Sequence, residues 1–196
     1  MTLWPTARSR DGGVDEIPWP SSGGGRLWLC GKHFVGPDPD AALALIGATT
    51  IVCLTARFEL EDRYPDYVAW LDRHSPNQAL WFPIPDLHAP KVDAAVALIE
   101  TLYERLLAGE RLLVHCGAGI GRAGTVAVGL LMTTGLSRQE ALTTVAAHRP
   151  MAGPEVGAQV ELIDALSILW GRAEWGTGAT WAGTRETDGM NRDAIQ

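Results

Sequence analysis

The sequence predicts an α/β fold in which helices cover both faces of a central, mainly parallel sheet. Short apolar runs alternate with longer segments of helical periodicity, and hydrophobic residues make up 46% of the chain. Strands that alternate with helices form parallel sheets, because each helix returns the chain to the level at which the next strand begins. At 196 residues the chain can form one domain with a substantial core.

The elements of the first half follow in order. Residues 26–30 are a short apolar run and are predicted to be a strand. Residues 38–46 begin with an aspartate cap and a first-turn proline, which predicts a helix. Residues 50–54 are β-branched and apolar, which indicates a buried strand. Three large apolar side chains at helical spacing then predict a helix within residues 65–73.

The second half continues the alternation. A strand is predicted at residues 80–84, and a helix at residues 91–108 has apolar side chains on one face and a glycine at its end. Residues 112–115 form the last predicted strand. Helices are then expected over residues 125–132, 137–147 and 154–169. The middle one begins with the capping-box pair Ser137 and Glu140.

The two ends of the chain differ from its middle. Residues 1–24 contain three prolines and are predicted to be an N-terminal arm or irregular loop. Residues 25–171 are the predicted domain. Residues 172–196 mix glycine, threonine and charge without periodicity, which predicts a flexible or loosely docked tail.

Composition argues against several classes of function. A net charge of −7 disfavours binding to nucleic acid or to an anionic membrane surface. Apolar runs fall short of the ~18 residues of a membrane helix, and the first residues lack the apolar stretch of a signal peptide. Three cysteines argue against a disulfide scaffold. We therefore expect a cytoplasmic protein with neither nucleic acid nor membrane as a partner.

The most informative segment is residues 115–122, which joins a predicted strand to a predicted helix. Its small residues let backbone N–H groups converge on a tetrahedral anion, and the following helix adds positive potential. The same donors stabilise a thiolate, so Cys116 is expected to ionise readily. Phosphate or sulfate is the expected occupant of this loop.

Cleavage of a phosphate monoester by a cysteine requires a thiolate, donors for the equatorial oxygens and an acid for the leaving oxygen. Cys116 supplies the thiolate, and the fork of Arg122 binds two phosphate oxygens at once, which a lysine would not reproduce. The predicted phosphate-binding residues are Gly117, Ala118, Gly119, Ile120, Gly121 and Arg122.

Asp86 is the candidate acid. It follows the strand at residues 80–84, and the neighbouring prolines stiffen its loop. To act as an acid at neutral pH it must hold a proton, which a closed, partly apolar site would favour. A structural alternative is that Asp86 or Asp93 merely caps the helix at residues 91–108.

Together these residues resemble the cysteine-dependent protein tyrosine phosphatases, most closely the dual-specificity branch. The resemblance rests on the pattern His-Cys, five residues and Arg after an apolar strand, with Pro-x-Pro-Asp upstream, and covers roughly residues 26–170. It implies a phosphocysteine intermediate on Cys116, phosphate binding by Arg122, and Asp86 as general acid and then general base. It also implies that no metal or other cofactor is needed.

Three further positions are compared with the family. His115 matches the histidine that tunes the cysteine through hydrogen bonds, and Gln159 resembles the glutamine that helps to place the hydrolytic water. An exposed helical glutamine fits the loose spacing around Gln159 better. The family often has Ser or Thr after the arginine; here Ala123 stands there, and Thr125 is expected to face elsewhere. The breakdown of the phosphoenzyme is the step that this departure puts in doubt.

Other charged and sulfur-containing residues allow two interpretations each. Arg57, Glu59 and Asp62 fall on a third loop at the same sheet edge, where they either shape substrate access or are ordinary solvated charges. His88 either contacts the leaving group or merely lies on the acid loop. Cys53, inside a β-branched strand, is expected to be an inert core thiol rather than a redox partner of Cys116.

Three competing functions are considered. A rhodanese-like sulfurtransferase also uses a cysteine in a short anion loop, but it would not need Asp86. A non-catalytic phosphate-binding module remains open because of Ala123. The glycines at 119, 121 and 124 also match a dinucleotide fingerprint, but too little chain follows them for a nucleotide domain.

The expected substrate is a phosphoprotein or a small phosphomonoester. Residues 117–121 contain no lysine, unlike the basic loops of inositide phosphatases in the family, and the net charge is −7. These observations favour phosphotyrosine, with phosphoserine or phosphothreonine in addition, over highly anionic inositol phosphates.

Overall fold

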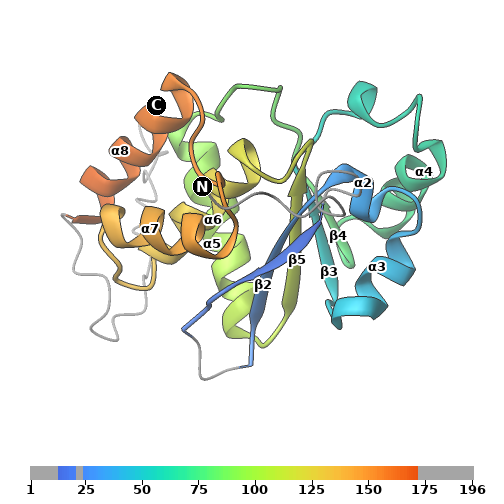
Figure 1. The fold of residues 1–196 in the computed structure, drawn as a ribbon, viewed down its shortest axis with the longest axis horizontal. Coiled ribbons are helices and arrows are strands. Elements are labelled where there is room, and N and C mark those ends of the chain that lie inside the picture. Colours follow the sequence, from blue (N-terminus) through green and yellow to red (C-terminus); the bar gives the residue numbers. More distant parts are fainter. Residues whose placement is uncertain (1–12, 21–23, 172–196) are drawn as a thin grey trace, which may run out of the picture.

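The computed structural model describes residues 13–20 and 24–171 and confirms the predicted fold class. A five-stranded sheet with the order β1-β2-β5-β3-β4 lies between two groups of helices (Figure 1). All neighbouring strands are parallel except β1 and β2. The strands are β1 (Val14–Ile17), β2 (Arg26–Gly31), β3 (Thr50–Cys53), β4 (Ala79–Trp81) and β5 (Arg111–Cys116).

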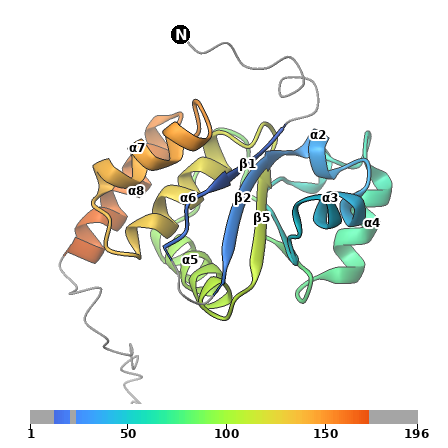
Figure 2. The same ribbon diagram turned by 60° about the horizontal axis from the view of Figure 1, so that its bottom comes forward.

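Within the predicted irregular arm at residues 1–24, strand β1 corrects the prediction for residues 14–17. Val14 pairs with Cys30 and Ile17 with Leu27, so β1 is an antiparallel edge strand on β2 (Figure 2). Its side chains alternate, with Asp15 and Ile17 buried and Glu16 exposed. The predicted tail at residues 172–196 lies outside the described residues.

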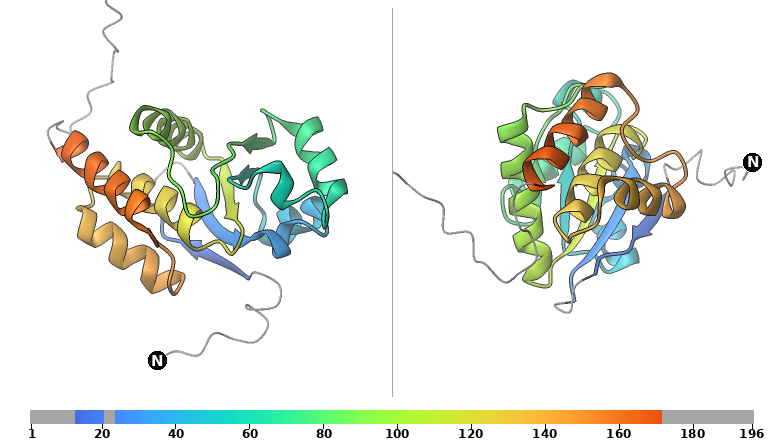
Figure 3. Two further views of the ribbon diagram at one scale, coloured as in Figure 1. Left: turned by 90° about the horizontal axis from the view of Figure 1, so that it is seen from above. Right: turned by 90° about the vertical axis from the view of Figure 1, so that its left-hand side faces the viewer.

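Two layers of helices cover the sheet (Figures 1 and 3). One face carries α2 (Lys32–Val35), α3 (Pro39–Ile46) and α4 (Pro65–His74). The other carries α5 (Val92–Leu107), α6 (Gly121–Met132), α7 (Arg138–His148) and α8 (Gly157–Gly171). The predicted caps are present, because Asp38 accepts a hydrogen bond from the amide of Ala41 and Ser137 forms a capping box with Glu140.

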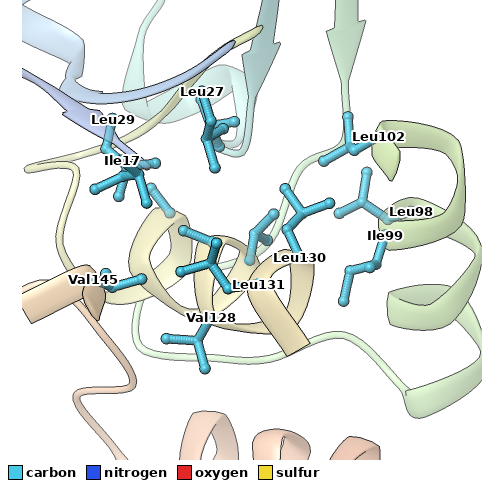
Figure 4. Packing of buried hydrophobic residues seen from close by; sticks show 14 of the residues in the cluster. Ile17, Leu27, Leu29, Leu98, Ile99, Leu102, Val128, Leu130, Leu131 and Val145 are labelled. Carbon is cyan, nitrogen blue, oxygen red and sulfur yellow. The ribbon is translucent and has the colours of Figure 1, made fainter. Parts of the chain in front are cut away.

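Helix α6 is the centre of the larger core. All of its residues are buried, because α5, α7 and α8 pack around it. Figure 4 shows the packing of β1 and β2 side chains, such as Ile17 and Leu27, near Leu130 and Leu131 of α6. A helix that is apolar on all sides suits this central place, and it holds the start of α6 fixed beside the end of β5.

Alternation along β5 sends neighbouring side chains to opposite faces of the sheet. Leu112, Val114 and Cys116 belong to the core under α5–α8, whereas Leu113 belongs to the core under α2–α4. His115 therefore points away from Cys116. Cys53 pairs with His115 across the sheet, so its side chain also lies on the face opposite to Cys116.

The strand predicted at residues 80–84 is observed as the shorter β4 (Ala79–Trp81), but the backbone stays extended beyond the end of β4. The amides of Phe82 and Ile84 donate to the carbonyls of Cys53 (2.9 Å) and Leu54 (3.0 Å). Pro83 and Pro85 occupy the alternate positions, whose nitrogens need no partner on β3. The prolines therefore guide the chain along β3 to Asp86 without loss of hydrogen bonds.

Candidate active site

The predicted site residues converge at the carboxyl ends of the parallel strands. Cys116 is the last residue of β5, and the loop after it leads directly into α6. A cavity of about 290 Å³ lies over this loop. It is lined by Lys32, Glu59, Asp86, Leu87, Cys116, Gly117, Ala118, Gly121, Arg122 and Glu155. The Cys116 side chain lies at its floor and is only 3% exposed.

The carbonyl groups of the loop all point away from the cavity to partners in the surrounding protein. A trans peptide directs its C=O and its N–H to opposite sides, so outward carbonyls imply inward amides. The bonds are Gly117 O with the Lys32 amide (3.0 Å), Ala118 O and Gly119 O with the Arg149 side chain (2.8 and 2.6 Å), Ile120 O with the Gly124 amide (2.8 Å) and Gly121 O with the Thr125 hydroxyl (2.7 Å).

The amides of residues 117–122 donate no hydrogen bond to any acceptor in the described part of the chain. These are the N–H groups that we expected, from the sequence, to bind a tetrahedral anion. Gly119 has a φ of 73°, and a Cβ at this position would collide with the carbonyl of Cys30. Glycine is therefore required at this point of the loop.

Arg122 is buried and tightly held. Its Nη1 and Nη2 donate to Glu59 Oε1 (2.7 Å) and Oε2 (2.9 Å), and Nη1 also donates to the carbonyl of Ile84 (2.8 Å). Burial is the largest single influence on the pKa of Glu59 and would raise it, but the Arg122 hydrogen bonds, the Ala56 amide and the nearby positive charges together hold that pKa below its usual value. Glu59 is thus the partner of Arg122 and not an ordinary solvated charge. Within the described residues, Arg122 Nε donates to no acceptor.

Asp86 lies in the same cavity, and its Oδ1 is 2.9 Å from Arg122 Nη2. Its side chain is 70% exposed, so the closed, partly apolar surroundings expected from the sequence are not present in this conformation. The next residue, Leu87, has a φ of 59° and lines the cavity with a largely exposed side chain. Asp86 does not begin α5, since the residue before that helix is Lys91.

His115 lies behind the loop on the other face of the sheet. Burial lowers its pKa to about 4, so the ring is neutral. Its Nδ1 lies 3.4 Å from the carbonyl of Cys116, which can only accept, and its Nε2 lies 2.6 Å from the hydroxyl of Tyr67. The neutral ring therefore carries its proton on Nδ1, and Tyr67 donates to Nε2.

Gln159 corrects the expectation of an exposed glutamine, because it is 1% exposed. Its Oε1 accepts from the amide of Glu155 (2.9 Å), and its Nε2 donates to the carbonyl of His88 (3.2 Å). Gln159 thereby joins the acid loop to the segment before α8. The carboxylate of Glu155 packs against the Cα of Gly121, where a side chain would collide with it.

Ala123 and Thr125 behave as the sequence indicates. Ala123 is fully buried, and the Thr125 hydroxyl donates a hydrogen bond to the carbonyl of Gly121. Cys53 is buried and hydrogen-bonded to Thr55, and burial raises its pKa to about 12. With its side chain on the opposite face of the sheet, it is not placed to form a disulfide with Cys116.

Several site residues were missed from the sequence. Lys32 lines the cavity and donates from Nζ to the carbonyl of Glu59 (2.7 Å), and Glu155 also lines the cavity. Arg149 holds two loop carbonyls. The only signal for these residues is their position after a strand or between helices, which many solvated charges share.

Neither a metal centre nor a membrane span is found in the part of the chain that the structure describes. No group of three or more His, Cys, Asp or Glu side chains there is arranged to hold a metal ion. None of the helices described has the length and apolar character needed to cross a membrane.

Comparison with known proteins identifies the family. Residues 34–166 match the family described as Swiss Army Knife protein, DSP-PTPase phosphatase domain. The chain belongs to this family of DSP-PTPase phosphatase domains. The match spans more than half of the chain and includes the cysteine loop, Arg122 and Asp86. The predicted membership of the cysteine-dependent phosphatase superfamily is thereby confirmed.

Curated relatives match over a shorter segment. The chain is 45% identical over 65 residues to Dual specificity protein phosphatase 22-B of Danio rerio, covering 33% of this chain and 36% of the relative. It is 47% identical over 65 residues to Dual specificity protein phosphatase 15 of Rattus norvegicus, covering 33% and 28%. The aligned part therefore spans only about a third of these relatives.

Solved structures share the fold over most of their length. Tk-PTP in its active form has a TM-score of 0.59 and 29% identity, covering 77% of this chain and 99% of that chain. Kinase associated phosphatase, with its catalytic cysteine replaced by serine, has a TM-score of 0.65 and 19% identity, covering 79% and 96%. Human DUSP28 has a TM-score of 0.57 and 21% identity, covering 74% and 90%. The last two likenesses concern the fold alone.

Proposed function

We propose that the protein is a phosphatase that hydrolyses phosphomonoesters on proteins through a phosphocysteine intermediate. One observation carries this proposal. A thiol, an arginine fork and a carboxylate line a single cavity whose floor presents amides without protein acceptors among the described residues. An anion-binding loop alone would explain the amides and Arg122, but it would need neither Cys116 nor Asp86. The sulfurtransferase alternative receives no support from the family match.

Phosphate binding would use the free edge of Arg122. Glu59 and Ile84 occupy Nη1 and one side of Nη2, which leaves Nε and the remaining side of Nη2 for an anion. Asp86 lies close to the same nitrogen, as an ion-pair contact of 2.9 Å between its Oδ1 and Nη2. A phosphate bound by Nε and Nη2 therefore displaces the Asp86 carboxylate from Arg122, while Glu59 keeps the guanidinium in place.

The first chemical step is attack of the Cys116 thiolate on phosphorus. The S–P bond forms as the bond to the leaving oxygen breaks, and Asp86, in its protonated form, donates its proton to that oxygen. The loop amides and Arg122 bind the equatorial oxygens, where charge resides in the transition state. In the second step Asp86 accepts a proton from water, whose oxygen attacks phosphorus and releases the Cys116 thiolate. Gln159 is bonded to the amide of Glu155, a residue that lines the cavity, and is proposed to help place this water.

The charges around the cavity favour a singly phosphorylated substrate. Three carboxylates, those of Glu59, Asp86 and Glu155, face two cations, Lys32 and Arg122. A second or third phosphate would meet the exposed carboxylates of Asp86 and Glu155, whereas an aromatic or aliphatic leaving group would meet Leu87. We therefore propose phosphotyrosine as the main substrate, with phosphoserine and phosphothreonine in addition, rather than polyphosphorylated inositol.

The decisive experiment measures hydrolysis of p-nitrophenyl phosphate and of phosphotyrosine peptides by the full chain. Cys116→Ser is expected to abolish turnover while it retains phosphate binding, and Asp86→Ala is expected to trap phosphoproteins. Wild-type protein that binds phosphopeptides without turnover would make this a phosphate-binding module instead. Sulfur transfer from thiosulfate without ester hydrolysis would indicate a sulfurtransferase.

A further inference from the structure

A buried ion pair lies behind the phosphate loop, on the side away from the cavity. Arg149, the capping residue directly after α7, is fully buried, and its Nη1 lies 2.8 Å from Oδ2 of Asp15 on β1. The Asp15 side chain is 8% exposed. Arg149 Nη1 also donates to the carbonyl of Leu29 on β2 (3.3 Å). The arginine thus links the N-terminal edge of the sheet to the end of α7.

The other two nitrogens of Arg149 reach the phosphate loop. Nε donates to the carbonyl of Gly119 (2.6 Å) and Nη2 to the carbonyl of Ala118 (2.8 Å). These two carbonyls depend on one side chain, whereas Gly117 is held by the backbone amide of Lys32 and Ile120 and Gly121 are held by residues of α6. In the middle of the loop, Arg149 is therefore the group that fixes the orientation of the peptides.

Because peptide groups are planar, the two hydrogen bonds to these carbonyls also fix the direction of the two N–H groups that follow them. With the Ala118 carbonyl held outward, the N–H of Gly119 must point inward, and the Gly119 carbonyl fixes the N–H of Ile120 in the same way. Arg149 thus orients the N–H groups of Gly119 and Ile120 towards the anion site. The contact is close, because a Cβ at Gly119 would lie 2.9 Å from Arg149 Nη2.

Asp15 supplies a carboxylate partner for this buried cation. Burial lowers the pKa of Arg149, which reflects the cost of placing its charge there. A guanidinium that loses a buried partner turns towards other acceptors or water, because an uncompensated buried charge is costly. The acceptors within its reach include the loop carbonyls themselves, so their geometry depends on Asp15.

We propose that Asp15 and Arg149 are positioning residues that set the affinity of the loop for a tetrahedral anion, so that β1 is part of the site. This inference rests on the proposed function only in taking the loop as an anion site, and it concerns binding rather than turnover. It assigns a role to a strand that carries no residue lining the cavity.

The experiment compares two neighbouring residues of β1. Asp15→Asn removes the buried charge and keeps the size of the side chain. Glu16→Gln is the matched control, because Glu16 pairs with Arg26 across the same two strands but at the exposed surface (2.6 Å). Binding of inorganic phosphate is measured by calorimetry well below the melting temperature of each variant, and KM and kcat are measured with p-nitrophenyl phosphate.

Asp15→Asn is expected to weaken phosphate binding at least tenfold and to raise KM, whereas Glu16→Gln stays within twofold of the wild type. Arg149→Lys keeps the charge but loses the fork, and it is expected to weaken binding to a similar extent. If Asp15→Asn does not fold, Arg149→Lys decides the question. A lower melting temperature with unchanged phosphate affinity would reduce the pair to a structural role and overturn the proposal.

The outcomes separate this inference from the proposed function. A wild type that binds phosphate but hydrolyses no ester would refute the proposed function, and the comparison of phosphate affinities would still test Asp15. Wild-type protein that binds no phosphate would overturn the inference itself.

Discussion

Lowering the pH from 7 to 5 is expected to destabilise the protein through His115, before most carboxylates take up protons. Burial holds the folded-state pKa of His115 at about 4, against 6.5 in an unfolded chain. The unfolded chain therefore binds a proton that the folded protein refuses. Stability is fully present above pH 6.5 and is lost as the pH falls towards 4.

The magnitude follows from these two values. Proton linkage gives a loss of about 2 kcal/mol in the free energy of unfolding between pH 7 and pH 5. Burial is the main cause, because the enclosed ring cannot be solvated as a cation; protonation would also force the Tyr67 hydroxyl, 2.6 Å from Nε2, to change from donor to acceptor. Tyr67 itself offers no relief, since burial raises its pKa well above the usual value.

Urea denaturation followed by tryptophan fluorescence at pH 7, 6 and 5 measures this loss. His115→Gln is the comparison, because an amide oxygen can accept from Tyr67 but does not titrate. The variant is expected to be less stable at pH 7 but to show a shallower dependence on pH, by about 2 kcal/mol at pH 5. Equal pH dependence in wild type and His115→Gln would refute the reasoning.

Three other substitutions test the site. Asp86→Asn is expected to lower kcat by about 10²- to 10³-fold, because the proposed acid is removed. It is expected to tighten phosphate binding by roughly 3- to 10-fold, because a carboxylate no longer competes with phosphate for Arg122. Steady-state kinetics and calorimetry measure the two effects, and weaker phosphate binding would contradict the displacement of Asp86 by phosphate. Ala123→Ser is expected to speed breakdown of the phosphoenzyme, seen as a smaller burst and faster turnover. Unchanged turnover would contradict the hypothesis that Ala123 slows this step. Gly119→Ala is expected to lower the free energy of unfolding by about 1–3 kcal/mol and to weaken phosphate binding more than tenfold, because Gly119 has a φ of 73° and the Cys30 carbonyl blocks a side chain there. The melting temperature and the phosphate affinity are measured together, and normal affinity would argue against a requirement for glycine.

The cysteine loop could be predicted because its signals are local. Apolar residues before it, glycines within it and an apolar helix after it encode a strand, a turn and a buried helix in consecutive positions. The edge strand β1 has no such signal, because Asp15 and Glu16 leave only two apolar residues in its four positions. Its pairing with β2 decides its conformation, and that pairing depends on the fold.

The supports of the site could not be predicted from spacing. Glu59, Arg149 and Tyr67 come from three different elements and reach their partners only after the sheet has formed. Gln159 was expected at the surface because the spacing around it is loose, but the loop that carries Asp86 folds over it and accepts its hydrogen bond at His88. In each case a polar residue was visible in the sequence, but its partner was far away along the chain.

The two halves of the site are built differently, and this difference links substrate binding to acid placement. Every carbonyl of residues 117–121 has a protein partner, so the anion loop is set before any substrate arrives. Asp86 instead depends on Arg122, the group that a phosphate must use. In the proposed mechanism an arriving phosphate takes the free edge of Arg122 and displaces Asp86, whose carboxyl group can then take up the proton that it later donates to the leaving oxygen. In the empty site Asp86 stays paired with Arg122.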